Sequence, residues 1–196
     1  ADRIGTIDEQ GNVLWGDRLM VVYARDILLE RPGSTIISEV KSSQSLYDDI
    51  AKQGGRPIMW KTGHSLIKAK MKSEHAVLAG EMSGHMFFAD RYFGYDDAIY
   101  ASCRLVEILA KTTRSLSALV ADLPKTSVTP EIRVDVSDSM KFQLARHVQE
   151  RLAHCAKTRE ELGPAKLVVR DAVTIDGVRA IFDDGWGLIR ASNTQP

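Results

Sequence analysis

The chain has 196 residues, of which 44% are hydrophobic and 27% are charged, a balance typical of globular domains that excludes disordered and collagen-like proteins. The 26 basic and 26 acidic residues cancel, and a net charge of zero argues against binding to nucleic acid or to an anionic membrane surface. No apolar run approaches the roughly 18 residues that a membrane helix needs, and the two cysteines, Cys103 and Cys155, predict no disulfide framework and favour a reducing cytoplasm.

The first half of the chain alternates between helix and strand patterns. Apolar residues at helical spacing, such as Leu19, Tyr23 and Ile27, predict a helix. Short apolar runs predict strands, and the acidic pair Asp96-Asp97 is typical of a helix start. The predicted elements are helix 17–30, strand 35–40, helix 45–53, strand 58–60, helix 65–73, strand 76–79 and a helix from 96 to about 111. This βαβ order predicts an α/β domain with a mixed, largely parallel sheet.

A different pattern follows a predicted linker at residues 123–128. Residues 132–136 alternate between apolar and polar side chains and predict a half-buried strand. The turn residues Asp176-Gly177 predict a hairpin. The other elements predicted here are helix 140–156, strands 167–169 and 179–182 on either side of that turn, and strand 186–189. We therefore expect a second, smaller α+β domain with an antiparallel sheet, truncated at its end.

Three polar stretches directly follow predicted strands. Lys41 follows the first strand, KTGHS at residues 61–65 follows the second, and GEMSGH at residues 80–85 follows the third. Strand ends are where α/β sheets place ligand sites. His64 offers proton transfer near neutral pH, and the Glu81 carboxylate accepts hydrogen bonds from neighbouring sugar hydroxyls. Taken singly, each stretch also fits an ordinary solvated or capped turn.

A fourth polar stretch, RASNT at residues 190–194, follows the last predicted strand. The planar guanidinium of Arg190 binds phosphate oxygens in pairs, and small hydroxyl and amide residues with their backbone N–H groups complete an anion cradle. A polar turn with a solvated arginine is the alternative for this stretch by itself. Because the net charge is zero, phosphate recognition is expected to depend on such local loops.

Taken together and in this order, these stretches resemble the α-D-phosphohexomutase superfamily, and most closely its phosphomannomutase/phosphoglucomutase branch. Asp2-Arg3 resembles the end of that family's metal-binding loop, and the other motifs match active-site loops along the whole chain. GEMSG and RASNT favour this branch over the phosphoglucosamine mutases, in which a Gln usually replaces Met82 and a Ser-Gly-Thr turn replaces residues 192–194.

The resemblance implies a place for this chain within a four-domain enzyme. Residues 1–12 would be the tail of domain 2, residues 13–124 domain 3, and residues 125–196 an incomplete domain 4. The family's catalytic phosphoserine lies in domain 1, and two of its three metal-binding aspartates precede Asp2. We therefore expect a C-terminal fragment that is inactive by itself and has the N-terminal domains as partners. We expect Mg²⁺ in the intact enzyme and not in the fragment, because Asp2 alone is a poor site for that ion.

The family's reaction moves phosphate between O1 and O6 of a hexose by way of a phosphoserine and a bisphosphorylated sugar. By resemblance, Arg3, Lys41 and His64 are catalytic candidates for proton transfer or for electrostatic support of the phosphoryl group. The other site residues would bind phosphorylated glucose or mannose: Glu81 and Ser83 at the sugar O3 and O4, His85 at the sugar or phosphate end, and Arg190, Ser192, Asn193 and Thr194 at the phosphate that is not transferred.

Two alternatives stand beside this interpretation. One is a stand-alone module that binds phosphosugars without catalysis, and the other is a mutase of the phosphoglucosamine type. A nucleic-acid function has no support from the charge.

Overall fold

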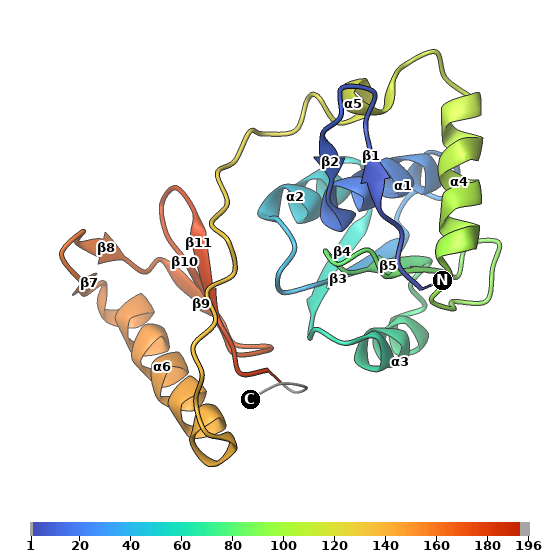
Figure 1. Ribbon diagram of the computed structural model, residues 1–196. Helices are drawn as coiled ribbons and strands as arrows, with labels where there is room; N and C mark the ends of the chain where they lie inside the picture. The colour runs from blue at the N-terminus through green and yellow to red at the C-terminus, as the bar shows by residue number, and fades with distance from the viewer. Residues whose placement is uncertain (1, 193–196) are drawn as a thin grey trace. The chain divides into compact units, whose positions relative to one another are not determined.

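The computed structural model describes residues 2–192 and divides into two compact units, Ala1–Thr126 and Ser127–Pro196. Figure 1 draws the first unit in blue through yellow-green and the second in yellow through red. None of the helices within residues 2–192 combines the length and the apolar character that crossing a membrane requires.

The first unit is an α/β domain. Its elements are β1 (Thr6–Ile7), β2 (Val13–Leu14), α1 (Gly16–Glu30), β3 (Thr35–Glu39), α2 (Gln44–Lys52), β4 (Arg56–Trp60), α3 (His64–Glu74), β5 (Leu78–Gly80), β6 (Met86–Phe88), α4 (Ala98–Ala110) and α5 (Leu116–Leu119). The main sheet has the order β4-β3-β5-β6, in which β3, β4 and β5 run parallel and β6 pairs antiparallel with β5. The predicted α/β class with a mixed sheet is confirmed, and β6 is an additional strand.

Helices cover both faces of this sheet (Figure 1). α1, α2 and α4 share one core, and α3 belongs to a second core on the opposite face. Ile36 of β3 packs in the core that holds Met20 and Tyr23 of α1, whereas the next residue, Ile37, packs with Ile67 of α3. Successive side chains of a strand point to opposite faces, so a central strand covered on both sides is buried throughout, as β3 is.

Side-chain caps begin two of the predicted helices. Ser43 precedes α2, and its Oγ accepts a hydrogen bond from the Ser45 N–H at 3.2 Å. Asp97 precedes α4, and its Oδ1 accepts from the N–H groups of Ile99 and Tyr100 at 3.0 and 2.9 Å. These bonds satisfy donors that have no acceptor within the helix, which is why the helices begin at these positions.

The second unit packs one long helix on a small antiparallel sheet. Its elements are α6 (Asp138–Thr158), β7 (Glu161–Leu162), β8 (Leu167–Val168), β9 (Asp171–Val173), β10 (Val178–Ile181) and β11 (Trp186–Ile189). The sheet has the order β11-β10-β9, and β7 and β8 form a separate pair. Cys155 of α6 is buried with Val169 and Ala180, which form the small core under the helix. The predicted α+β class with an antiparallel sheet is confirmed.

Two strand predictions in this unit are wrong. Residues 132–136 form no strand, and Ile132 and Val134 are 82% and 75% exposed. An alternating pattern becomes a strand only where a neighbouring strand offers hydrogen bonds, and within the described residues no strand pairs with this segment. The strand that precedes the Asp176-Gly177 turn is β9 and not residues 167–169, because β8 pairs with β7 instead.

Candidate functional site

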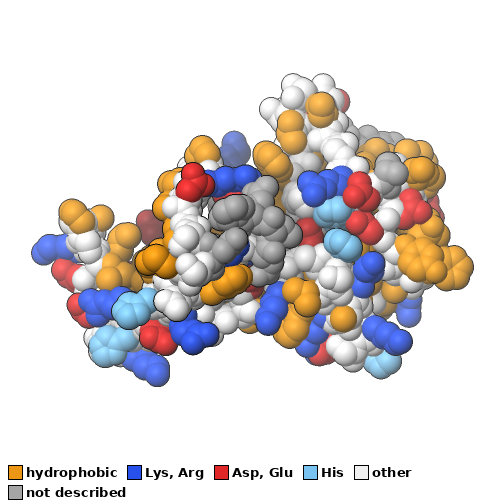
Figure 2. Space-filling view, turned by 60° about the horizontal axis from the view of Figure 1, so that its bottom comes forward, with side chains coloured by type: hydrophobic (Ala, Val, Ile, Leu, Met, Phe, Trp, Pro, Cys, Tyr) orange, Lys and Arg blue, Asp and Glu red, His pale blue; other side chains and the backbone are white. Residues whose placement is uncertain are grey.

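Three polar loops meet at one edge of the sheet in the first unit. They carry Lys41, KTGHS and GEMSGH at the carboxyl ends of β3, β4 and β5, whose parallel register places those ends side by side. His64 and Ser65 of KTGHS are the first residues of α3, and Gly80 of GEMSGH is the last residue of β5. The ring centroids of His64 and His85 lie 6.2 Å apart. Figure 2 shows histidine side chains next to acidic and basic ones on one face. The fold thus supplies the gathering of polar groups that the strand-end positions predict.

Glu81 joins two of these loops. Its side chain is almost completely buried, at 6% exposure. One carboxylate oxygen, Oε1, accepts a hydrogen bond from the Gly63 N–H at 3.0 Å, and the other, Oε2, accepts from the Ser83 hydroxyl at 3.1 Å. A carboxylate has further lone pairs on both oxygens, so Glu81 can also accept from a ligand that enters here.

Glu39 is a buried carboxylate at this site that no sequence motif indicated. It is the last residue of β3, it is 0% exposed, and its Oε1 accepts from the Met82 N–H at 3.0 Å. Its Oε2 lies 3.9 Å from Nζ of Lys41. Burial raises the pKa of Glu39, with Lys41 acting in the opposite direction. A charged residue inside the apolar run of a central strand is the signal that could have found it.

His85 has hydrogen-bond partners on both ring nitrogens. Its Nε2 lies 3.0 Å from Nε of Arg3, and its Nδ1 lies 2.5 Å from Oδ2 of Asp96 and 3.0 Å from the carbonyl oxygen of Asp2. Arginine only donates, so Nε2 must accept and Nδ1 must carry the proton in this arrangement. A carboxylate beside Nδ1 orients the ring and holds it in the tautomer that leaves Nε2 as the acceptor.

Asp96 therefore belongs to the candidate site, although its position before a helix predicts a capping residue. The acidic pair before α4 predicts a helix cap, and only Asp97 performs that role. Asp96 turns to His85 instead, and burial raises the pKa of its carboxyl, with His85 acting in the opposite direction.

One group of described residues at this site could hold a metal ion. Ligand atoms of Asp2, His85 and Asp96 lie within 4.8 Å of one another. Mg²⁺ prefers near-octahedral oxygen ligation, and this group offers two carboxylates and an imidazole. Oδ2 of Asp96 accepts from His85, whereas Oδ1 of Asp96 is buried without a hydrogen-bond partner among the described residues, so Asp2 and Asp96 could each supply a carboxylate oxygen.

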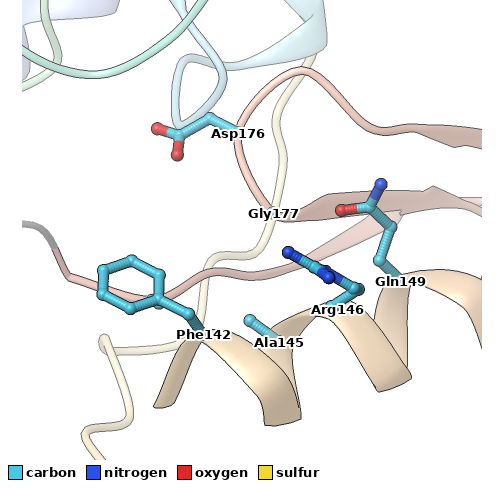
Figure 3. A pocket seen from close by; sticks show the side chains of 7 residues that line it. Phe142, Ala145, Arg146, Gln149, Asp176 and Gly177 are labelled. Carbon is cyan, nitrogen blue, oxygen red and sulfur yellow. The ribbon is translucent and has the colours of Figure 1, made fainter. Parts of the chain in front are cut away.

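In the second unit, Arg190 directly follows β11. Its Nε and Nη2 lie 3.3 and 3.2 Å from Oδ2 of Asp176 in the turn between β9 and β10. Ser192 is half-buried, and Asn193 and Thr194 lie outside the described residues. An open depression of about 240 Å³ borders this turn. It is lined by Phe142, Ala145, Arg146, Gln149, Asp176, Gly177 and Ala191. Figure 3 shows the four α6 side chains projecting toward the strands and the turn.

All described site residues predicted from the sequence thus lie in one of two groups. The first group, in the first unit, is linked by the contacts above and consists of Asp2, Arg3, Lys41, His64, Glu81, Ser83 and His85. Arg190 and Ser192 belong to the second.

Two family models match the chain. Residues 15–127 match "Phosphoglucomutase/phosphomannomutase, alpha/beta/alpha domain III", and residues 131–196 match "Phosphoglucomutase/phosphomannomutase, C-terminal domain". The chain is 46% identical over 195 residues to the phosphomannomutase/phosphoglucomutase of Pseudomonas syringae pv. tomato, with 100% of the chain and 39% of the relative covered. It is 43% identical over 196 residues to the phosphoglucomutase of Neisseria gonorrhoeae, with 100% and 40% covered.

Solved structures share the fold of this chain. A phosphoglucomutase/phosphomannomutase family protein from Burkholderia thailandensis matches with a TM-score of 0.82 and 40% identity, over 100% of this chain and 38% of that one. A protein from Thermus thermophilus described as a putative phosphomannomutase shares the fold, with a TM-score of 0.69 and 17% identity, over 97% of this chain and 38% of that one. The chain therefore spans about two fifths of the length of the relatives that it matches.

Proposed function

Because this chain belongs to the phosphoglucomutase/phosphomannomutase family, we propose that it supplies the sugar-binding and phosphate-binding parts of a phosphohexomutase. Such an enzyme interconverts hexose 1-phosphate and hexose 6-phosphate. The chain spans 39% of its Pseudomonas relative, and the phosphoserine of the resemblance would come from domains that precede residue 1. We propose residues 1–12, 13–124 and 125–196 as the tail of domain 2, domain 3 and domain 4.

The observation that carries this proposal is the position of Glu81. It lies nearly buried where three loops meet, with its two carboxylate oxygens held by Gly63 and Ser83. A rigidly held carboxylate can accept from two neighbouring hydroxyls of one sugar ring, which suits O3 and O4 of a hexose. Glucose and mannose share the configuration at both positions, so Glu81 would bind either sugar.

Proton transfer and electrostatic support of the phosphoryl group would come from the polar groups around the Glu81 loop. Arg3, Lys41 and His64 are the candidates by family resemblance, and His85 joins them on its geometry. With Asp96 behind Nδ1, His85 is oriented to accept a proton at Nε2, where Arg3 now donates. Arg3 and Lys41 would then support the charge of the phosphoryl group.

The phosphate that is not transferred would bind to Arg190 and Ser192, together with Asn193 and Thr194. Support comes from the guanidinium at the end of β11 and from the small donors that follow it. In the intact enzyme, Asp2 would supply one ligand to Mg²⁺, and the bound ion would neutralise charge on the transferred phosphoryl group. The free thiols of Cys103 and Cys155 fit a reducing compartment, and we place the reaction in the cytoplasm.

Calorimetric titration of the 196-residue chain with glucose 1-phosphate and mannose 1-phosphate tests the sugar site. Glu81→Gln should weaken the binding of both ligands, whereas Glu30→Gln at the exposed end of α1 should not. Equal affinity of Glu81→Gln and wild type would contradict the proposal. Preference for glucosamine 1-phosphate would favour the phosphoglucosamine type, and turnover by the chain alone would contradict its proposed dependence on other domains.

A further inference from the structure

The turn between β9 and β10 is built against Arg190. In the register of β10 with β11, Val178 lies opposite Ile189, so the preceding Gly177 lies beside Arg190. A Cβ on Gly177 would overlap the carbonyl oxygen of Ile189 and lie 2.7 Å from Cα of Arg190. Gly177 also has a φ of +71°, which a side chain would strain. A glycine is therefore needed here for the turn to approach the arginine backbone.

The neighbouring residue of the same turn holds the arginine side chain. Oδ2 of Asp176 lies 3.3 Å from Nε and 3.2 Å from Nη2 of Arg190. Both side chains are largely sheltered, at 13% and 20% exposure for Asp176 and Arg190 respectively. Sheltering from water strengthens this ion pair beyond that of an exposed surface pair.

The geometry of the contact selects one edge of the guanidinium. A guanidinium has two edges that can bind an oxyanion through a pair of N–H groups, Nε with Nη2 and Nη1 with Nη2. Asp176 engages the first edge. Asp176 leaves Nη1 and the second N–H of Nη2, and these two groups form the edge that a phosphate would use.

We infer that Asp176 is a positioning residue for the phosphate-binding role of Arg190. This inference rests on the proposed function and assigns a role to a residue outside the RASNT motif. Asp176 holds the guanidinium of Arg190 in place before substrate binds. Arg190 therefore loses less rotamer entropy when it binds a hexose phosphate. The Asp176-Gly177 turn is thus part of the phosphate site and not only a connection between strands.

Asp176 could instead be only a counter-ion to Arg190. A carboxylate next to a guanidinium repels an incoming phosphate dianion, so a mere counter-ion would weaken binding, and its removal would strengthen it. Asp176→Asn removes the charge but keeps a carbonyl oxygen that can accept from the guanidinium. Asp176→Ala removes both, so the pair of variants separates orientation from charge.

The test uses nuclear magnetic resonance on the 15N-labelled 196-residue chain, with glucose 1-phosphate as the probe. The heteronuclear NOE of the Arg190 Nε–H group reports how firmly the guanidinium is held. Asp176→Ala should lower that NOE and weaken glucose 1-phosphate binding by about threefold to tenfold, the range expected for one immobilised long side chain. Asp176→Asn should retain the order of Arg190 and bind at least as tightly as wild type. Asp184→Ala, an exposed carboxylate of the same unit, is the matched control.

A double-mutant cycle shows whether Asp176 acts through Arg190. In an Arg190→Ala background, Asp176→Ala should have no further effect on binding. Tighter binding by Asp176→Ala, or an unchanged Nε–H NOE in that variant, would overturn the inference while Arg190 kept its proposed role. If Arg190→Ala binds glucose 1-phosphate as wild type does, or if the ligand leaves the Arg190 resonance unperturbed, the proposed phosphate site itself is wrong and the inference fails with it.

Discussion

Oδ2 of Asp96 lies 2.5 Å from Nδ1 of His85, so the residue just before the cap of α4 belongs to the site and not to the helix. Its neighbour Asp97 performs the capping. Two adjacent carboxylates thus have different roles, and substitutions can separate them.

Asp96→Ala should weaken the preference of His85 for a proton on Nδ1. In the wild type, Nε2 accepts from Arg3 and Nδ1 carries the proton that faces Asp96. Without the carboxylate, the preference for a proton on Nδ1 should fall, because only the Asp2 carbonyl remains as its acceptor among the contacts of this ring. The 15N chemical shifts of the His85 ring measure the tautomer directly. Asp97→Ala is the control, and a ring spectrum unchanged in Asp96→Ala would contradict the assignment.

Asp97→Ala should destabilise the first unit. The substitution removes an acceptor for two N–H groups at the start of α4, and loss of such a cap typically costs about 1 kcal/mol. It also removes the acceptor of the Tyr92 hydroxyl, which donates to Oδ2 at 2.7 Å. Urea unfolding measures the change in the free energy of unfolding. Asp97→Asn should recover part of the loss, and equal losses in the Asn and Ala variants would argue against capping.

Glu39→Gln should change how stability depends on pH. Burial raises the pKa of Glu39 above its ordinary value of 4.5. A carboxyl with a higher pKa in the folded state binds its proton more tightly there, so it favours folding at low pH, and this contribution is lost as the pH rises from 4.5 through the folded-state pKa. The neutral glutamine lacks this loss, so its stability relative to wild type should increase with pH across that window.

Urea unfolding at a series of pH values, from below 4.5 to mildly alkaline, measures this difference. Glu30→Gln is the control, because Glu30 is exposed. A stability difference between Glu39→Gln and wild type that stays constant over the series would show that Glu39 titrates alike in the folded and unfolded chains.

Gly16→Ala should disturb the loop that carries Glu81, although Gly16 belongs to none of the site motifs. Gly16 begins α1 and donates its N–H to the carbonyl of Met82 at 3.2 Å. An added Cβ would overlap the Glu81 carbonyl oxygen and lie 2.9 Å from that of Met82, and backbone atoms cannot yield as side chains do. Overpacking of this kind costs about 1–3 kcal/mol. Thermal unfolding measures the cost, and Gly5→Ala, which meets no atom within 4 Å, is the control. Equal stability of the two variants would contradict the tight packing of this loop.

The fold class and the grouping of most residues of the candidate site could be predicted from local sequence. Helical spacing predicted α1, and apolar runs predicted β3 and β5. Lys41, KTGHS and GEMSGH each follow such a strand, and parallel strands end at the same edge of a sheet. Their convergence therefore follows from the order of elements alone.

Residues 132–136 show where this reasoning fails. Their alternation is that of a half-buried strand, yet they are largely exposed and pair with no strand in the described part of the chain. The period of a pattern tells which residues share a face and does not tell whether another strand lies beside them.

The sequence by itself determined the α/β and α+β classes, the helix start at Asp97 and the loops that carry the motifs, because propensity, capping and periodicity act between residues close in the chain. Only the tertiary structure decided the contacts of Glu39, Asp96 and Asp176. Glu39 accepts from a backbone N–H of a loop 43 residues away, and Asp96 and Asp176 reach side chains 11 and 14 residues away. Whether a carboxylate caps a turn, faces water or orients a site residue depends on which distant groups the fold brings within hydrogen-bond reach.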